Sequence, residues 1–158
     1  FGSRVMVGGF LLNNELTDFS FVPERNGRLI ANRVQGGKRP RSSMAPTVVL
    51  KAGKPFLITG SPGGSRIISY VARTIFNILE WGLDPQAALN SGHIVNRNGV
   101  TELEEGTDAI KLKEGLESLG HKVKVRNLNS GLHSILFAED GTLIGAADPR
   151  REGLVMGE

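Results

Sequence analysis

The stretch PFLITGSPGGSRIISYVARTIFNILEWG, residues 55–82, decides the fold. It opens with an apolar run typical of a buried strand, Phe56 to Thr59, and continues from Arg66 to Trp81 with apolar residues at helical spacing. Between them, Gly63 and Gly64 leave two consecutive amides unshielded by side chains. Consecutive amides before a helix can converge on negative charge, so the turn is a candidate oxyanion site. The simpler interpretation is a tight strand-to-helix turn.

On both sides of this stretch, the sequence predicts strands and helices that alternate irregularly. Leu50 and Phe56 flank a turn that predicts a hairpin, and Phe10–Leu12 predicts a short buried strand. Residues 20–46 show no period and predict a long surface excursion. The other predicted elements are strands over 47–50, 123–126, 134–138 and 142–146, helices over 85–89 and 107–119, and a hairpin at Asn98-Gly99. This pattern indicates a layered α/β or α+β fold with an antiparallel or mixed sheet.

The composition sets limits on the function. The chain has 158 residues, no cysteine, a formal net charge of +3 and no apolar run long enough to span a bilayer. These features predict one domain over residues 1–158, no disulfide or thiol nucleophile, no membrane span and no nucleic-acid partner. His93, His121 and His133 show no metal spacing, so we expect structural histidines and no metal site.

Two polar clusters carry further chemistry. Glu15 and Asp18 are three residues apart, so both carboxylates can point the same way from a turn or helix and hold an ammonium group. Ser42 and Ser43 can donate hydrogen bonds to a carboxylate. Each pair also has a plain structural interpretation, as a solvated capping turn and as turn serines beside prolines.

Four strings in one order give the chain a family resemblance. They are LLNNELTDFS at 11–20, KRPRSSMAPT at 38–47, TGSPGGSRI at 59–67 and ADPRR at 147–151. In this order they resemble the small subunit of γ-glutamyltranspeptidase, an N-terminal nucleophile (Ntn) hydrolase, along nearly the whole chain. The resemblance implies an α+β fold of the αββα sandwich type, lacking here the first, nucleophile-bearing strand and the large subunit. An uncovered sheet edge would favour self-association of the chain.

The resemblance also implies roles for single residues. Glu15 and Asp18 match residues that bind the α-amino group of a γ-glutamyl substrate. Ser42 and Ser43 match those that hold its α-carboxylate. Gly63 and Gly64 match the glycines of the oxyanion hole, in agreement with the interpretation of the turn.

The implied activity is that of a γ-glutamyltransferase or glutathione hydrolase, formed when a precursor zymogen cleaves itself. A terminal threonine, absent from this chain, would form an acyl enzyme that water, an amino acid or a peptide then accepts, with no cofactor. We therefore expect residues 1–158 alone to be inactive and to need the large subunit. Most bacterial members would be periplasmic or secreted, and a cytoplasmic location stays open. Alternatives are a glutaryl-cephalosporin acylase, a poly-γ-glutamate enzyme, or a noncatalytic binding module of the same fold.

Overall fold

The computed structural model describes residues 4–157 and divides the chain into two compact units, residues 1–42 and 43–158. Whether they belong to the single domain expected from the sequence stays a prediction.

The first unit is built from short local elements. They are β1 (Met6–Val7), β2 (Phe10–Leu11), the 3-10 helix η1 (Glu15–Asp18), β3 (Glu24–Arg25) and β4 (Arg28–Leu29). β1 pairs with β2 and β3 with β4, both antiparallel. Within its described residues, Phe19 is the one fully buried hydrophobic side chain. The expected buried strand at Phe10–Leu12 is wrong, because Phe10 is 63% exposed on a two-residue strand.

The second unit contains a four-stranded antiparallel sheet of order β11-β10-β6-β5. Its strands are β5 (Thr47–Lys51), β6 (Lys54–Gly60), β10 (His133–Phe137) and β11 (Leu143–Ala147). Successive side chains of a strand point to opposite faces. Leu57 and Thr59 of β6 are therefore buried beneath the helices, whereas Ile58 between them faces away and is 38% exposed. The predicted hairpin of β5 and β6 is confirmed, and so are the strands predicted over 134–138 and 142–146.

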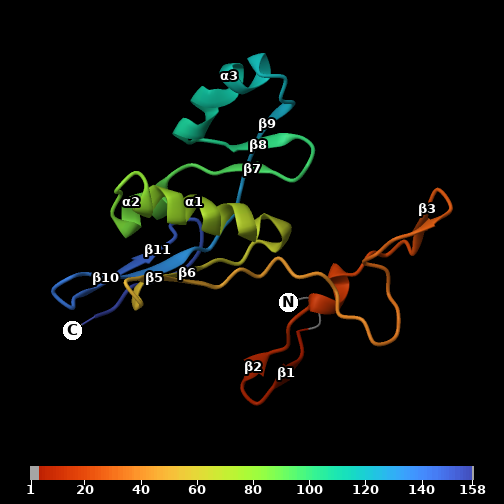
Figure 1. Ribbon diagram of the computed structural model, residues 1–158, viewed down its shortest axis with the longest axis horizontal. Helices are drawn as coiled ribbons and strands as arrows, with labels where there is room; N and C mark the ends of the chain where they lie inside the picture. Colours follow the sequence, from red (N-terminus) through yellow and green to blue (C-terminus); the bar gives the residue numbers. More distant parts are fainter. Residues whose placement is uncertain (1–3, 158) are drawn as a thin grey trace. The chain divides into compact units, whose positions relative to one another are not determined.

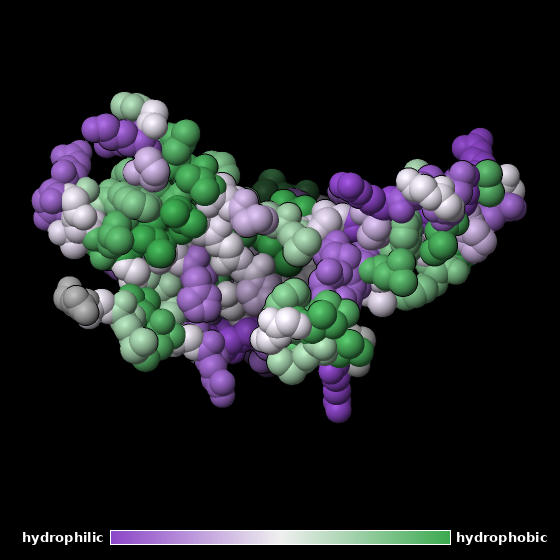
Figure 2. All heavy atoms as spheres, turned by 90° about the horizontal axis from the view of Figure 1, so that it is seen from below, coloured by the Kyte–Doolittle hydropathy of each residue, from purple (hydrophilic) through white to green (hydrophobic). Residues whose placement is uncertain are grey.

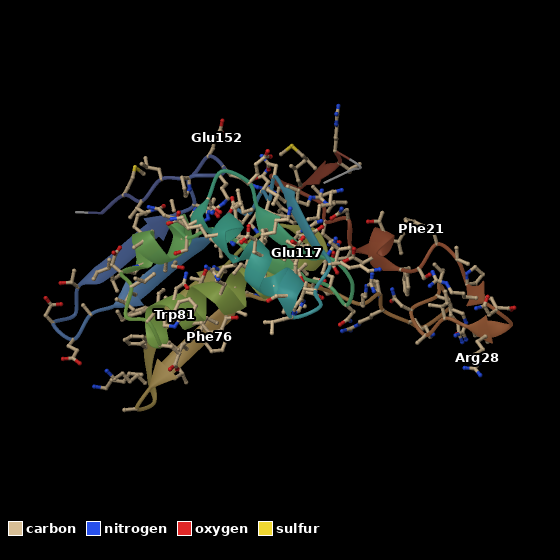
Figure 3. All side chains as sticks on the ribbon, turned by 90° about the horizontal axis from the view of Figure 1, so that it is seen from above. Phe21, Arg28, Phe76, Trp81, Glu117 and Glu152 are labelled. Carbon is tan, nitrogen blue, oxygen red and sulfur yellow. The ribbon has the colours of Figure 1, made fainter. Side chains whose placement is uncertain are left out.

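Two helices cover one face of this sheet (Figure 1). After the short 3-10 turn η2 (Gly64–Arg66) come α1 (Ile67–Leu79) and α2 (Pro85–Asn90). The Asp84 side chain accepts a hydrogen bond from the Ala87 amide at 3.0 Å and caps α2, as the Asp-Pro pair predicts. Tyr70 and Val71 of α1 form the main core with Leu89, Leu132 and Ala146. Near the end of α1, Phe76 and Trp81 project outward (Figure 3).

A smaller mixed sheet lies on the other side of α1 (Figure 1). It contains β7 (Ile94–Asn96), β8 (Thr101–Glu104) and β9 (Val123–Arg126), with β8 antiparallel to β7 and parallel to β9. The predicted helix over 107–119 forms as the 3-10 helix η3 (Asp108–Leu112) followed by α3 (Lys113–Ser118). The sequence also predicts a buried face for this helix, formed by Ile110, Leu112, Leu116 and Leu119. This prediction is wrong at Leu112 and Leu119, which are 48% and 78% exposed.

The face of the four-stranded sheet that is turned away from α1 is apolar. Val48, Ile58 and Ile135 stand opposite one another on three neighbouring strands and are 57%, 38% and 41% exposed. Hydrophobic side chains gather on this side of the unit (Figure 2). On the next strand, β11, the residue opposite Ile135 is Gly145. A Cβ atom there would lie only 2.5 Å from Val155, so the segment near the end of the chain covers the β11 edge of this face.

Candidate functional site

The glycine turn connects the end of β6 directly to α1. Gly63 has φ +143° and Gly64 has φ +58°, both in the region that favours glycine. Within residues 4–157, neither amide nitrogen donates a hydrogen bond to another residue. The turn is fixed from its N-terminal side, because Ser61 Oγ accepts the Gly131 amide at 3.2 Å and donates to the Pro62 carbonyl at 2.7 Å. Two unpaired amides at a helix N-terminus can stabilise an oxyanion.

The Tyr70 ring supports the turn from below. A Cβ atom on Gly63 would lie 2.8 Å from Tyr70 Cε2, so only glycine allows this close approach. Tyr70 is 1% exposed, and its ring centroid lies 4.2 Å from that of His93. His93 is itself buried, and burial lowers its pKa to about 4. The two buried rings, whose planes are tilted by 37°, thus fix the position of the Gly63 backbone.

A buried polar network holds His93 in turn. His93 Nε2 lies 2.7 Å from Ser130 Oγ, which donates to the Asp148 carboxylate. Asp148 also accepts the Leu132 amide at 2.9 Å and an Arg150 N–H at 3.1 Å. Since Ser130 donates to Asp148, its oxygen is left to accept from His93. The network therefore assigns the proton of neutral His93 to Nε2.

Arg150 joins this network to β8. Its guanidinium binds the Glu104 carboxylate through Nε at 2.5 Å and Nη2 at 2.7 Å, and it donates to the carbonyls of Leu89 and Ser91 at 2.8 and 3.0 Å. Both carboxylates that it contacts, Glu104 and Asp148, are buried. The ADPRR string thus supplies a residue that connects α2, β8 and the end of β11.

Three arginines surround a second buried carboxylate on β8. Arg66 binds Glu102 bidentately at 2.7 and 2.9 Å, and Arg126 binds it at 3.0 Å. Arg97 lies 3.6 Å away. The hydrogen bond from Arg66 is the main cause that lowers the pKa of Glu102 to about 2. No local sequence pattern indicates this cluster, because its members are far apart along the chain.

The two candidate carboxylates lie together on η1. In a 3-10 helix, residues i and i+3 eclipse each other, so Glu15 and Asp18 share one face. Both are half-buried, and neither takes part in a salt bridge between described residues. Asn13 Oδ1 accepts the Glu15 amide at 3.0 Å, and Thr17 Oγ1 donates to the Asn14 carbonyl at 2.7 Å. The turn is therefore held mainly by its own hydrogen bonds.

Asn32 joins this turn to the segment that carries the serines. Its Nδ2 donates to the Asp18 carbonyl at 2.7 Å, and its Oδ1 accepts the Arg41 amide at 2.9 Å. Ser42 follows Arg41 directly, so one side chain sets the spacing between the carboxylate turn and the first serine. The sequence offered no signal for Asn32 beyond its polarity.

The candidate residues fall into three groups within the structure. Glu15 and Asp18 share η1 of the first unit, Gly63 and Gly64 form one turn of the second, and Ser42 and Ser43 lie where the units meet along the chain. Their convergence on one pocket stays a prediction. Over residues 4–157, no three acidic or histidine side chains cluster as metal ligands would, and no helix has the length and apolarity to cross a membrane.

Comparison with known proteins agrees with these features. The fold matches a crystal structure of Helicobacter pylori γ-glutamyltranspeptidase (T380A mutant) with a TM-score of 0.80 and 32% identity, over 95% of this chain and 87% of that one. The class is thus an α+β fold of the Ntn-hydrolase type. The chain is 42% identical to the glutathione hydrolase proenzyme of Escherichia coli K12, over 95% of this chain and 27% of the relative.

A family model described as gamma-glutamyltranspeptidase matches residues 1–158, and the chain belongs to that family. It is also 33% identical to the acylase ACY 1 proenzyme of Pseudomonas sp. SE83, over 97% of this chain and 27% of the relative. The chain spans about a quarter of the length of both curated relatives.

Proposed function

We propose that this chain forms part of a γ-glutamyltransferase or glutathione hydrolase, with Gly63 and Gly64 as its oxyanion hole. One observation carries the proposal: two consecutive unpaired amides at the start of α1, held by the buried ring of Tyr70. Preorganised donors of this kind stabilise the charge that develops in acyl transfer. Membership of the γ-glutamyltranspeptidase family supports the choice of reaction.

In the proposed reaction, a threonine hydroxyl from the complete protein adds to the γ-carbonyl carbon of the donor. The carbonyl oxygen becomes an oxyanion, which the amides of Gly63 and Gly64 bind. The C–N bond then breaks, and the leaving amine takes a proton. Water or the amine of an acceptor attacks the resulting ester, which releases glutamate or a new γ-glutamyl amide and restores the threonine hydroxyl.

The donor is proposed to carry an α-ammonium and an α-carboxylate, as glutathione does. Glu15 and Asp18 supply two carboxylates on one face of η1 with no cation from the described chain between them. Ser42 and Ser43 supply hydroxyls for the α-carboxylate. A γ-glutamyl group satisfies both sets at once.

The partner is proposed to be the remainder of the precursor, its large subunit. The apolar ladder of Val48, Ile58 and Ile135 offers it a face to pack on. A cavity of about 320 Å³ on this sheet runs from Ile58 to Pro62 and from Gly131 to Ile135, so it ends beside the glycine turn.

A second candidate is an acylase that acts on glutaryl amides, favoured by the likeness to the ACY 1 proenzyme. A glutaryl donor has no α-ammonium, so it would leave Glu15 and Asp18 unpaired. A poly-γ-glutamate donor would differ in the length of its chain. The carboxylate pair on η1 therefore favours a γ-glutamyl donor.

The test compares γ-glutamyl-p-nitroanilide with glutaryl-p-nitroanilide in the complete, processed protein. We expect kcat/KM to favour the γ-glutamyl compound by about tenfold or more, since a hydrogen bond between charged groups contributes about 1.5–3 kcal/mol. Glu15→Gln and Asp18→Asn should each reduce that preference, whereas Glu24→Gln on the same unit should leave it unchanged. A preference for the glutaryl compound would assign the protein to the acylases, and no turnover after confirmed self-cleavage would contradict the proposal.

A further inference from the structure

A basic cavity of about 350 Å³ opens beside the glycine turn. Its lining residues come from the glycine turn with η2, from α1, from the end of β9 with the loop after it, and from the segment after β11. They are Gly63, Gly64, Arg66, Tyr70, Arg126, Asn127, Leu128, Asn129 and Arg151. Three of these side chains are cationic, and no carboxylate is among them. The proposed mechanism assigns the two amides to an oxyanion but gives the arginines no role.

The positive charge around this cavity exceeds the nearby negative charge. Glu102 is the acid bound by Arg66 and Arg126, and Arg97 approaches the same carboxylate at 3.6 Å. One carboxylate thus faces three guanidinium groups. The Arg126 side chain is 42% exposed, so part of its guanidinium remains accessible for a second anion.

Arg151 adds a further cation. Among the described residues, no carboxylate forms a salt bridge with it. Its Nε donates to Asn129 Oδ1 at 3.2 Å and to the Ser130 carbonyl at 3.0 Å, and its Nη2 donates to the Asn129 carbonyl at 3.0 Å. A Cβ atom on Gly131 would lie 2.9 Å from Arg151 Cδ, so this glycine lets the arginine lie close to the loop. The neighbouring Glu152 projects away from the body of the unit (Figure 3).

Tyr70 supplies a neutral donor at the base of the cavity. It is 1% exposed, lines the cavity, and its hydroxyl makes no hydrogen bond to another residue of 4–157. Burial raises the pKa of this hydroxyl, so the proton stays in place at neutral pH. The hydroxyl oxygen is open to the cavity and is not sealed in the core, so an anion bound there can accept its hydrogen bond.

We propose that this cavity binds the free carboxylate of the amino acid or peptide that leaves or accepts the acyl group. The inference rests on the proposed function and adds a substrate subsite to it. Gly63 and Gly64 line the cavity and also bind the oxyanion in the proposed reaction. A dipeptide attached at the reacting carbon places its carboxylate roughly 7 Å from its amine, since an extended residue spans about 3.5 Å. Arg126 and Arg151 then recognise the carboxylate, and Tyr70 donates to it.

The experiment uses the complete, processed protein with γ-glutamyl-p-nitroanilide as donor. Glycylglycine and glycylglycinamide serve as acceptors that differ in the free carboxylate. Arg126→Gln should raise the acceptor KM about tenfold for glycylglycine and change it less than about twofold for the amide. Arg126→Lys should fall between the two, because it keeps the charge and loses the planar fork.

The matched control is Lys124→Gln, which removes an exposed positive charge from the same strand outside the cavity. It should leave the ratio of the two acceptor KM values unchanged. On the leaving-group side, the parallel test compares two donors: glutathione, and the amide formed at the carboxylate of its glycine. Equal effects of Arg126→Gln on acid and amide, or no effect on either, would overturn the inference.

A direct binding measurement separates this inference from the proposed function. If the wild-type protein shows no γ-glutamyl turnover, the proposed function fails, and calorimetric titration with glycylglycine and its amide decides on the site. Tighter binding of the free acid that is lost in Arg126→Gln and in Arg151→Gln would uphold the site. Equal or absent binding of both compounds by the wild type would overturn it.

Discussion

The two units hold their candidate residues in different ways. In residues 43–157, the glycine turn is supported by a continuous buried path from Gly63 through Tyr70, His93 and Ser130 to Asp148. In residues 4–42, the described hydrophobic side chains include one that is fully buried, Phe19, and η1 is held mainly by local hydrogen bonds.

This difference in support matches the different requirements of the two halves of the proposed site. An oxyanion hole must be rigid before the substrate arrives, because its donors stabilise charge without reorganising. This chain builds that rigidity from its own core. The carboxylates that would hold the ammonium group have no comparable core within their unit, so we expect their final placement to depend on substrate and on the rest of the protein.

The largest effect is expected from Arg150→Met in the second unit. The change leaves the buried carboxylates of Glu104 and Asp148 without their shared cation. Breaking a buried ion pair in this way costs about 3–5 kcal/mol, measured as the free energy of unfolding by denaturant titration. Arg33→Met, the matched change in the first unit, loses hydrogen bonds to Ile30 and Gln35 and should cost about 1 kcal/mol. Equal losses would remove the contrast between the units.

The next effect concerns the turn itself. Gly63→Ala places a methyl group 2.8 Å from the Tyr70 ring at φ +143°, so the amide must move. We expect kcat for γ-glutamyl-p-nitroanilide to fall by about 10²–10³, the effect of losing one oxyanion donor. Gly64→Ala meets open space at φ +58° and should cost about tenfold or less. The reverse order would contradict the role of Tyr70 as support.

Buried His93 should make stability depend on pH. Its pKa is about 4 in the folded chain and about 6.5 when unfolded, so between these values only the unfolded state binds the proton. The free energy of unfolding should therefore fall by about 3 kcal/mol as the pH drops from about 6.5 to about 4. His93→Gln keeps a donor for Ser130 without titrating and should flatten this part of the profile. If the slope of unfolding free energy against pH were unchanged in His93→Gln, another group would cause the pH dependence.

The smallest effect is expected from Asn32→Ala. The change removes hydrogen bonds to the Asp18 carbonyl and from the Arg41 amide, each of which contributes about 0.5–1.5 kcal/mol. We expect KM for the γ-glutamyl donor to rise about tenfold with kcat nearly constant, because Asn32 positions binding groups only. Gln35→Ala on the same segment is the control and should leave KM unchanged. A fall in kcat alone would place Asn32 in a different role.

Much of the second unit could be predicted from the sequence, because its signals are local. The period of α1, the Asp84 cap and the alternation around Leu57 each depend on neighbours within a few residues. The first unit was harder, since Phe10 is apolar but no second layer of its unit covers it. Tertiary context, which a single strand does not encode, decides the burial of such a residue.

The glycine turn could be recognised, but its supports could not. Glu102 and Glu104 in the TELE strand look like solvent-facing residues, yet both are buried, because Arg66 and Arg150 reach them from 36 and 46 residues away. The Tyr70–His93 contact likewise joins α1 to the start of β7. Such pairings arise from topology, and a sequence pattern with a period of two or 3.6 residues carries no information on them.

The most direct test of the central claim is a crystal structure of the complete, processed protein with a boronic acid analogue of a γ-glutamyl donor. The nucleophile would add to boron and create a tetrahedral oxyanion mimic. We expect one boronate oxygen about 2.7–3.1 Å from the amide nitrogens of Gly63 and Gly64, with the Tyr70 ring unmoved beneath them. A boronate oxygen bound by other donors, with both amides facing solvent, would contradict it.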